Sequence, residues 1–254
     1  MKIKLLLVFF SLFEVHAEEN FLSYCNREDQ SIEEKVTLSY IKIKIRSFSC
    51  EEINEKIPQI TTLDLSQTKD ITDLTPLKFF KNIKHLDLTN SKKIKNLGPL
   101  AYLTDLKTLK LEDNMIEDLT PLSELTSLEL LVLDWNKITN YFPISHLPNL
   151  KVLKLSYNQI KSVAPLRDLP SLETIFINGN LIEEISSMAD LTQLKVAKLW
   201  LNQIKDISPL KYLMSLENID VEENPIIKDA AHCPSDANTS TQVRAFCLKY
   251  LKAL

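Results

Sequence analysis

Apolar residues recur along the chain in one fixed pattern that restarts eight times between residues 60 and 224. In the copy that covers residues 106–127, Leu109 and Leu111 lie two positions apart between polar neighbours, which predicts a short strand with one buried face. The copies begin at Ile60, Ile83, Leu106, Leu128, Leu150, Leu172, Leu194 and Leu216. A period of 22 or 23 residues predicts a solenoid in which each copy forms one coil.

A polar residue follows each predicted strand at the point where the chain must bend. Six copies carry Asn there, at Asn114, Asn136, Asn158, Asn180, Asn202 and Asn224. An amide both donates and accepts hydrogen bonds, so stacked copies predict a structural ladder rather than a catalytic row. Thr68 and Ser91 replace Asn in the first two copies, where we expect an irregular ladder. Because the chain has only two glycines, we expect Asn, Asp, Ser and Pro to hold the bends in place of glycine with positive φ.

The copy at residues 106–122 resembles the leucine-rich repeat family, and within it the internalin-like class with 22-residue repeats. The resemblance covers residues 60 to about 226. It implies an α/β fold, a right-handed β/α superhelix with a curved parallel sheet on its concave face, helical or extended turns on its convex face, and protein binding by the concavity. One copy departs from the pattern, because Ser187 and Met188 stand where the others carry Pro-Leu.

The two ends of the chain do not follow the repeat. Residues 1–17 combine early lysines, an apolar run and a small-residue ending at Ala17, which is typical of a signal peptide; the run is too short for a membrane anchor. We therefore expect a secreted, periplasmic or cell-envelope protein with no membrane span. Residues 18–59 are expected to form an N-terminal helical cap, residues 60–226 the eight repeats and residues 227–254 a C-terminal helical cap.

Local signals support helices in both caps. Ser31 and Glu34 form a capping-box pattern before one predicted helix, and Ser49 opens a second, shorter one. Residues 38–45 also alternate partly as a strand would, so a strand is the alternative there. Residues 241–251 place apolar side chains at helical spacing.

All four cysteines lie outside the repeats, Cys25 and Cys50 before them and Cys233 and Cys247 after them. Eight stacked strands would hold the two ends roughly 35 Å apart, too far for a disulfide. The predicted bonds are therefore Cys25–Cys50 and Cys233–Cys247, and a metal site built from all four cysteines fails for the same reason.

Composition and charge narrow the range of partners. The apolar content of 44% and charged content of 25% are ordinary for a folded domain. The net charge of −4 argues against nucleic acid, which requires a basic surface. We expect a monomer that binds a protein, without a cofactor.

Side chains that alternate with the core leucines are left free by the fold, and on repeats four to seven many of them are apolar or aromatic. We predict that they bind the partner, because large exposed apolar patches mark interaction sites. The predicted residues are Leu130, Val132, Trp135, Val152, Lys154, Tyr157, Phe176, Val196, Lys198, Trp200 and Leu201, with Glu112 and Asp134 at their edge. The alternative is that these aromatic side chains only stiffen the sheet by packing on neighbouring strands.

His85, Asp64 and Asp87 are expected to lie together on the first repeats, and such a group can bind a metal or transfer protons. We interpret them as a solvated polar face, because an open sheet gives little desolvation. No other catalytic motif is evident, so we expect no enzyme. Two alternatives to a binding module remain, a structural or adhesive envelope protein and an intracellular module similar to phosphatase regulators. The signal peptide and paired cysteines argue against the second.

Overall fold

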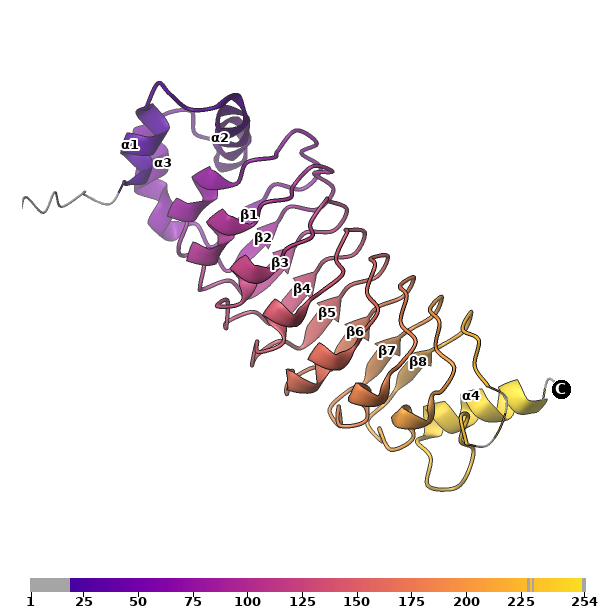
Figure 1. The fold of residues 1–254 in the computed structure, drawn as a ribbon. Coiled ribbons are helices and arrows are strands. Elements are labelled where there is room, and N and C mark those ends of the chain that lie inside the picture. Colours follow the sequence, from indigo (N-terminus) through magenta and orange to yellow (C-terminus); the bar gives the residue numbers. More distant parts are fainter. Residues whose placement is uncertain (1–18, 228, 230, 253–254) are drawn as a thin grey trace, which may run out of the picture.

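The protein is an elongated solenoid closed by helices at both ends (Figure 1). The computed structural model describes residues 19–227, 229 and 231–252. The expected signal peptide, residues 1–17, lies outside the described residues. Within them, no helix combines the length and the apolar character needed to cross a membrane.

Each sequence repeat contributes one three-residue strand to a single parallel sheet whose order follows the chain. The strands are β1 (Thr62–Asp64), β2 (His85–Asp87), β3 (Thr108–Lys110), β4 (Leu130–Val132), β5 (Val152–Lys154), β6 (Thr174–Phe176), β7 (Val196–Lys198) and β8 (Asn218–Asp220). The register is constant, so that Leu109, Leu131 and Leu153 are direct neighbours across β3, β4 and β5. The leucine-rich repeat fold inferred from the repeat is therefore confirmed.

Short 3-10 helices return the chain along the opposite side of the solenoid from the sheet (Figure 1). They are η1 (Ile57–Gln59), η2 (Thr75–Phe79), η3 (Gly98–Tyr102), η4 (Thr120–Leu122), η5 (Phe142–Ile144), η6 (Ala164–Asp168), η7 (Ser186–Met188) and η8 (Ser208–Leu210). Most of them carry Pro in the first turn, where its fixed φ suits a helix start. Although η7 has no Pro, it still forms and buries Met188 completely. Leucine and isoleucine side chains from both sides fill the space between sheet and helices.

The asparagine ladder forms as predicted and joins each coil to the one before it. The side chain of Asn158 accepts a hydrogen bond from the N–H of Ile138 at 2.9 Å and donates to the carbonyl of Leu133 at 3.0 Å and to that of Leu155 at 3.0 Å. The same pattern recurs at Asn136, Asn180, Asn202 and Asn224. Each amide thus satisfies buried backbone groups that the bend leaves open.

The ladder is irregular in the first two repeats, also as predicted. The hydroxyls of Thr68 and Ser91 donate to carbonyls of their own repeats, at Leu65 and Leu88. The side chains of Thr and Ser are shorter than that of Asn. The hydroxyl oxygens of Thr68 and Ser91 lie 3.4 Å from each other.

The backbone at the bends corrects one expectation. The residue before each ladder position has a positive φ in all eight repeats, and only one of the eight is glycine, Gly179. The other seven are Gln67, Asn90, Asp113, Trp135, Tyr157, Leu201 and Glu223. The scarcity of glycine therefore does not remove the left-handed conformation. In several repeats the bend is accompanied by a backbone hydrogen bond to the next coil, such as that from Trp135 N–H to the Ser156 carbonyl at 2.9 Å.

Three α-helices cover the N-terminal end, namely α1 (Phe21–Asn26), α2 (Ile32–Ile45) and α3 (Cys50–Lys56). The capping box at α2 is present, with Ser31 and Glu34 each bonded to the other's backbone N–H, so residues 38–45 are helical and the strand alternative is wrong. Ser49 caps α3 as predicted. Helix α1 had no clear signal in the sequence.

A buried polar group and a disulfide hold these helices together. Glu34 accepts hydrogen bonds from the Tyr24 hydroxyl at 2.8 Å and from Arg27 Nη2 at 2.7 Å. Desolvation opposes the charge of Glu34, but these bonds and that from Ser31 N–H outweigh it, so the pKa of this carboxyl is lowered. Cys25 is bonded to Cys50, as predicted.

The N-terminal helices are joined to the first coil on its convex side. The Thr37 hydroxyl donates to the Asp73 carbonyl at 2.7 Å. The ring of Phe21 packs edge-on against Phe79 and Phe80.

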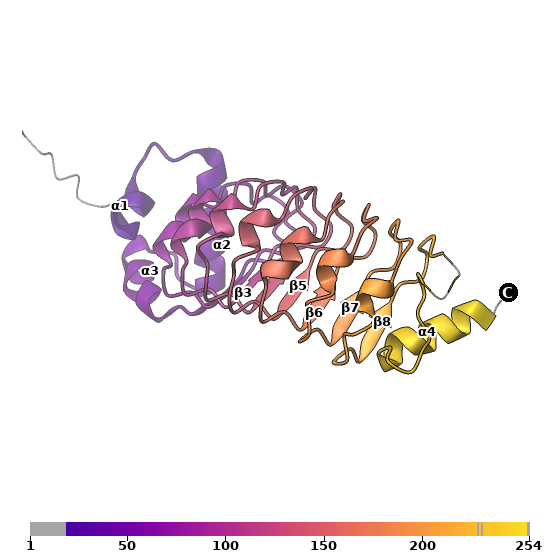
Figure 2. The ribbon, with the colours of Figure 1, turned by 60° about the horizontal axis from the view of Figure 1, so that its bottom comes forward.

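Helix α4 (Thr241–Lys252) lies beyond β8 at the opposite end of the solenoid (Figure 2). It is tied to the preceding loop by the predicted Cys233–Cys247 disulfide. Val243 and Cys247 are buried, which follows from the helical spacing of apolar residues seen in the sequence. Ser240 N–H donates to the Lys211 carbonyl at 2.7 Å, which fixes the start of the helix against the last coil.

Candidate partner-binding surface

The residues predicted to bind a partner lie on β4 to β7 or within three positions after those strands. Trp135 and Leu201 remain 52% and 44% exposed. The other residues predicted to bind a partner, except Val132, are half-buried. Because Trp135 is half exposed, packing within the sheet does not account for its whole surface.

Val132 corrects the prediction, because it is only 6% exposed. Its register neighbours on β3 and β5 are Lys110 and Lys154, whose side chains are much longer. A small side chain flanked by two long ones contributes little accessible area. Val132 therefore has little accessible area through which it could contact a partner.

The aromatic side chains form one continuous group across three repeats. The rings of Trp135 and Tyr157 are stacked, with centroids 3.9 Å apart and planes inclined by 14°. Tyr157 in turn meets Trp200 edge-on, at 6.1 Å and 79°. We call Trp135, Tyr157, Phe176, Trp200 and Leu201 the aromatic surface. Both tryptophans of the chain belong to it.

Gly179 makes room for this arrangement. It occupies the bend between Tyr157 and Leu201 with a φ of 60°, and a Cβ at this position would lie 2.7 Å from Cδ1 of Tyr157. The Tyr157 ring therefore lies against the glycine backbone, from which it reaches Trp200 two repeats away. The sequence analysis missed this role of Gly179, although a glycine among bulky residues in a chain with two glycines is a usable signal.

Three bulky residues at the position equivalent to Gly179 in other repeats adopt a backbone conformation that favours glycine. Trp135, Tyr157 and Leu201 have φ values of 56°, 55° and 56°. Such backbone positions cost of order 1–3 kcal/mol for residues with a Cβ, and they tend to persist at functional sites. Asn or Gly would fit these bends with less strain.

The two lysines of the predicted site have partners within the chain. The Nζ of Lys154 lies 4.9 Å from the ring centroid of Phe176, a cation–π contact. Lys198 donates to Asn218 Oδ1 at 2.8 Å. Both cations are therefore already engaged.

Three polar residues, Asp134, Ser156 and Asn178, follow β4, β5 and β6 beside the aromatic side chains. The burial of Asp134 differs from expectation. Asp134 was expected at the exposed edge, yet it is only 9% exposed, because the bend that follows β4 directs it against the next coil. One carboxylate oxygen accepts from Ser156 N–H at 2.6 Å. Burial raises the pKa of the Asp134 carboxyl, and nearby Glu112 adds to the effect, whereas Ser156 opposes it. Asn178, two repeats further on, is 8% exposed.

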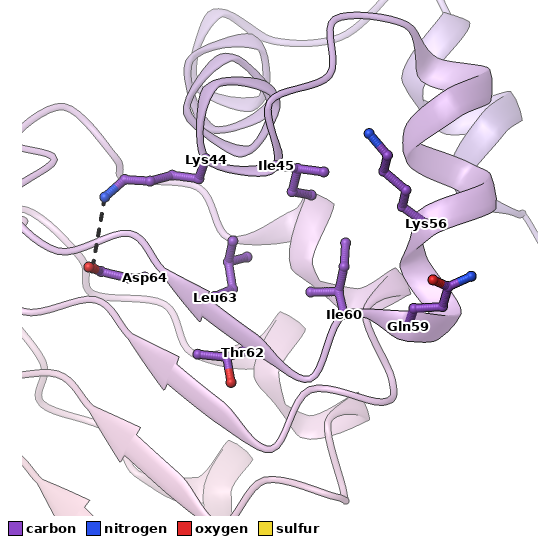
Figure 3. Close-up of a pocket in the computed structure, with 8 residues that line it drawn as sticks. All are labelled: Lys44, Ile45, Lys56, Gln59, Ile60, Thr62, Leu63 and Asp64. Carbon is purple, nitrogen blue, oxygen red and sulfur yellow. Dashed lines mark ion pairs between the residues drawn. The ribbon is translucent and has the colours of Figure 1, made fainter.

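A groove of about 560 Å³ lies at the first repeat, between the N-terminal helices and β1 (Figure 3). Its sides carry Lys44, Lys56 and Asp64 above apolar Ile45, Ile60 and Leu63. Lys44 Nζ reaches the Asp64 carboxylate at 3.9 Å. An adjoining depression of about 340 Å³ extends the groove over β2 and β3.

The His85 group does not form a metal site. Asp87 is paired with Lys110 at 3.1 Å, and the His85 side chain makes no hydrogen bond or ion pair with any described residue. In the described part of the chain, no three His, Cys, Asp or Glu side chains gather as a metal ion requires. These residues form a charged, solvated face.

Two similar solved structures come from the bacterium Listeria monocytogenes. An internalin, InlF, from Listeria monocytogenes is 36% identical, with a TM-score of 0.64 over 65% of this chain and 48% of that one. Internalin C2 from the same organism is 31% identical, with a TM-score of 0.63 over 73% of this chain and 92% of that one. This chain belongs to the internalin-like leucine-rich repeat proteins.

Other comparisons agree with that family at a coarser level. Residues 148–190 match the family described as Leucine Rich repeats (2 copies). The ectodomain of the Arabidopsis thaliana receptor kinase GASSHO1/SCHENGEN3, solved in complex with CASPARIAN STRIP INTEGRITY FACTOR 2, is 28% identical, with a TM-score of 0.55 over 60% of this chain and 20% of that one. A search of the curated proteins gave no significant match. Leucine-rich repeat domains generally mediate protein–protein binding. This internalin-like chain spans about half of InlF but nearly all of internalin C2.

Proposed function

We propose that this internalin-like chain is exported and binds a protein partner through the aromatic surface on repeats four to seven. The observation that carries the proposal is the exposure of Trp135 and Leu201 at strained left-handed positions. The fold does not require bulky apolar residues at this position, because other repeats hold Gln67, Asn90, Asp113 and Glu223 there. Tryptophan and tyrosine are also the residues most enriched among binding hot spots.

Export is supported by features at both ends of the chain. Residues 1–17 carry the signal-peptide pattern, and disulfides such as Cys25–Cys50 and Cys233–Cys247 persist mainly in oxidising compartments. Measuring the molecular mass of the protein recovered outside the cytoplasm tests whether the chain is exported and its signal peptide removed. We expect an N-terminus that follows Ala17, and recovery of the uncleaved chain only from the cytoplasm would contradict export.

Capture of binding proteins tests the surface. The purified chain and a Trp135→Ala/Trp200→Ala variant are immobilised and exposed to the same extracts, and bound proteins are quantified by mass spectrometry. Each truncated hot spot is worth about 2 kcal/mol, or roughly 30-fold in affinity, so specific partners should be lost from the variant.

A matched control separates this effect from a general loss of aromatic surface. Tyr102 and Tyr212 are exposed but lie at the 3-10 helices η3 and η8, away from the sheet. A Tyr102→Ala/Tyr212→Ala variant should retain the partners. Equal capture by the wild-type chain and the double tryptophan variant would refute the proposal and favour a structural or adhesive role.

A further inference from the structure

If the aromatic surface binds a protein, as proposed above, its charged border restricts which partner segments fit. Apart from Phe176, the aromatic surface and its charged border share the second and third positions after each strand, the border being the acidic residues among them. In all eight repeats these positions contain no Lys or Arg. Acidic residues stand at both ends of the aromatic surface, Glu112 and Asp134 before it and Glu222 and Glu223 after it.

The acidic residues, unlike the lysines, have few partners within the chain. Glu112 and Glu223 form no ion pair with any residue that the structure describes, and Asp134 is held by Ser156 rather than by a cation. Glu222 is approached only by the highly exposed Lys249, at 3.6 Å. By contrast, Lys110 is paired with Asp87, whereas Lys154 and Lys198 contact the neutral side chains of Phe176 and Asn218. The surface therefore carries acidic residues with few partners at its two ends and two lysine charges at its centre, which disfavour a basic residue there.

One further polar atom is short of a donor. Among the described residues, Oδ1 of Asn178 is buried and accepts no hydrogen bond. It occupies the row between Ser156 and Trp200, beside the aromatic rings. An unsatisfied buried acceptor costs free energy, and a donor from a partner reaches this atom only after neighbouring side chains move.

We propose that the partner segment crossing this surface has apolar side chains at its centre and Lys or Arg on both sides. The aromatic surface takes the apolar centre, Glu112 takes the basic residues at one end, and Glu223 takes those at the other. Asp134 is nearly buried and bonded to Ser156, so it offers a partner little contact.

The spacing of the strands sets the length of such a segment. Glu112 and Glu223 lie on the third and eighth repeats, five strand spacings apart, which corresponds to roughly 24 Å. An extended chain covers this distance with about seven residues. The groove beside the N-terminal helices (Figure 3) is a poorer site for a basic segment, because Asp64 already has a lysine partner there.

Selection of peptides from a random twelve-residue library displayed on phage tests the proposal. Three versions of the full chain are used: wild type, Glu112→Lys/Glu223→Lys, and a control, Glu124→Lys/Asp190→Lys. The control makes the same change in net charge at exposed residues near η4 and η7. Far-UV circular dichroism and urea unfolding establish that all three are folded.

Wild type and control should select peptides with Lys or Arg on both sides of an apolar centre, and the charge-reversed chain should not. A synthetic copy of a selected peptide is then titrated by the fluorescence of Trp135 and Trp200, which report directly on this surface. Charge reversal should weaken binding at least tenfold, and added salt should weaken binding to wild type more than to the reversed chain.

Three results would overturn the proposal: selected peptides without basic residues, equal affinity for wild type and the reversed chain, or no peptide enriched above background. If either of the first two results is found while Trp135→Ala/Trp200→Ala loses binding, the aromatic surface does bind the peptide and only the proposed charge preference is wrong. Peptides bound equally well after that double substitution would instead refute the proposed function.

Discussion

Gly179 is the residue at which backbone conformation and the aromatic surface can be tested by one small change. Gly179→Ala adds a methyl group at a φ of 60°, where a residue with a Cβ costs about 1–2 kcal/mol. The new Cβ would also lie 2.7 and 2.9 Å from Cδ1 and Cε1 of Tyr157. The ring must therefore move, and it loses its contact with Trp200, worth about 0.5–1.5 kcal/mol.

Together these contributions predict a loss of roughly 1.5–3.5 kcal/mol in the free energy of unfolding. For a domain of this size the melting temperature should fall by roughly 3–14 °C. Urea and thermal unfolding measure the loss, and near-UV circular dichroism and tryptophan fluorescence measure the displacement of the rings.

The only other glycine of the chain supplies the control. Gly98 has no positive φ, and a Cβ there would meet only the side-chain oxygen of Asn96, at 3.0 Å. Gly98→Ala should therefore change stability by less than about 1 kcal/mol and leave the aromatic signals unaltered.

A double-mutant cycle separates the two causes. In a Tyr157→Ala background no ring opposes the new methyl group, so Gly179→Ala should cost only the backbone part, about 1–2 kcal/mol. The reasoning is wrong if Gly179→Ala leaves stability and the near-UV spectrum unchanged, or if its cost is the same with and without the Tyr157 ring.

Three further predictions concern the ladder, a buried acid and a disulfide. Asn158→Ala leaves the Ile138 N–H without its acceptor and removes one of the two amide donors at each of the Leu133 and Leu155 carbonyls, so the free energy of unfolding in urea should fall by roughly 2–5 kcal/mol, whereas the exposed Lys137→Ala should have little effect; similar losses in both would contradict the ladder's role. Burial raises the pKa of the Asp134 carboxyl, so its ionised form costs folding free energy above the folded-state pKa and this cost disappears as the pH falls through that value. Asp134→Asn should accordingly be more stable than wild type at neutral pH and equal to it in acid, and a difference independent of pH would show that the charge is not the cause. Cys50→Ala opens a loop with a sequence separation of 25 residues and should cost about 3 kcal/mol, while thiol titration of the unfolded wild-type chain should detect free thiols only after reduction.

Several features of the fold could be predicted because they depend on spacing along the chain. The apolar pair Leu109 and Leu111, the amide at Asn114 and the proline that follows recur at fixed offsets, and each has a local physical role. The same spacing fixed the distance between the two ends and hence the cysteine pairing. Helix α1 escaped prediction because six residues offer too little periodicity to recognise.

The candidate site was predicted less completely, because its properties depend on contacts between repeats. Val132 and Asp134 occupy positions that alternate with core leucines, yet both are nearly buried, one between longer side chains and the other against Ser156. The left-handed bends were hidden because residues as different as Gln67, Trp135 and Leu201 adopt them, each with a backbone hydrogen bond to the next coil.

The sequence by itself thus determined the coil, its stacking and the closure of its ends, since a 22-residue repeat has one strand register that buries all of its leucines. Only the tertiary structure decided which side chains are available to a partner. Neighbours on this surface, such as Trp135, Tyr157 and Trp200, are 22 or 43 positions apart in the chain, and their contacts depend on ring size and on the space above Gly179. Spacing within one repeat carries no information about such lateral packing, because it is set by the differences between repeats.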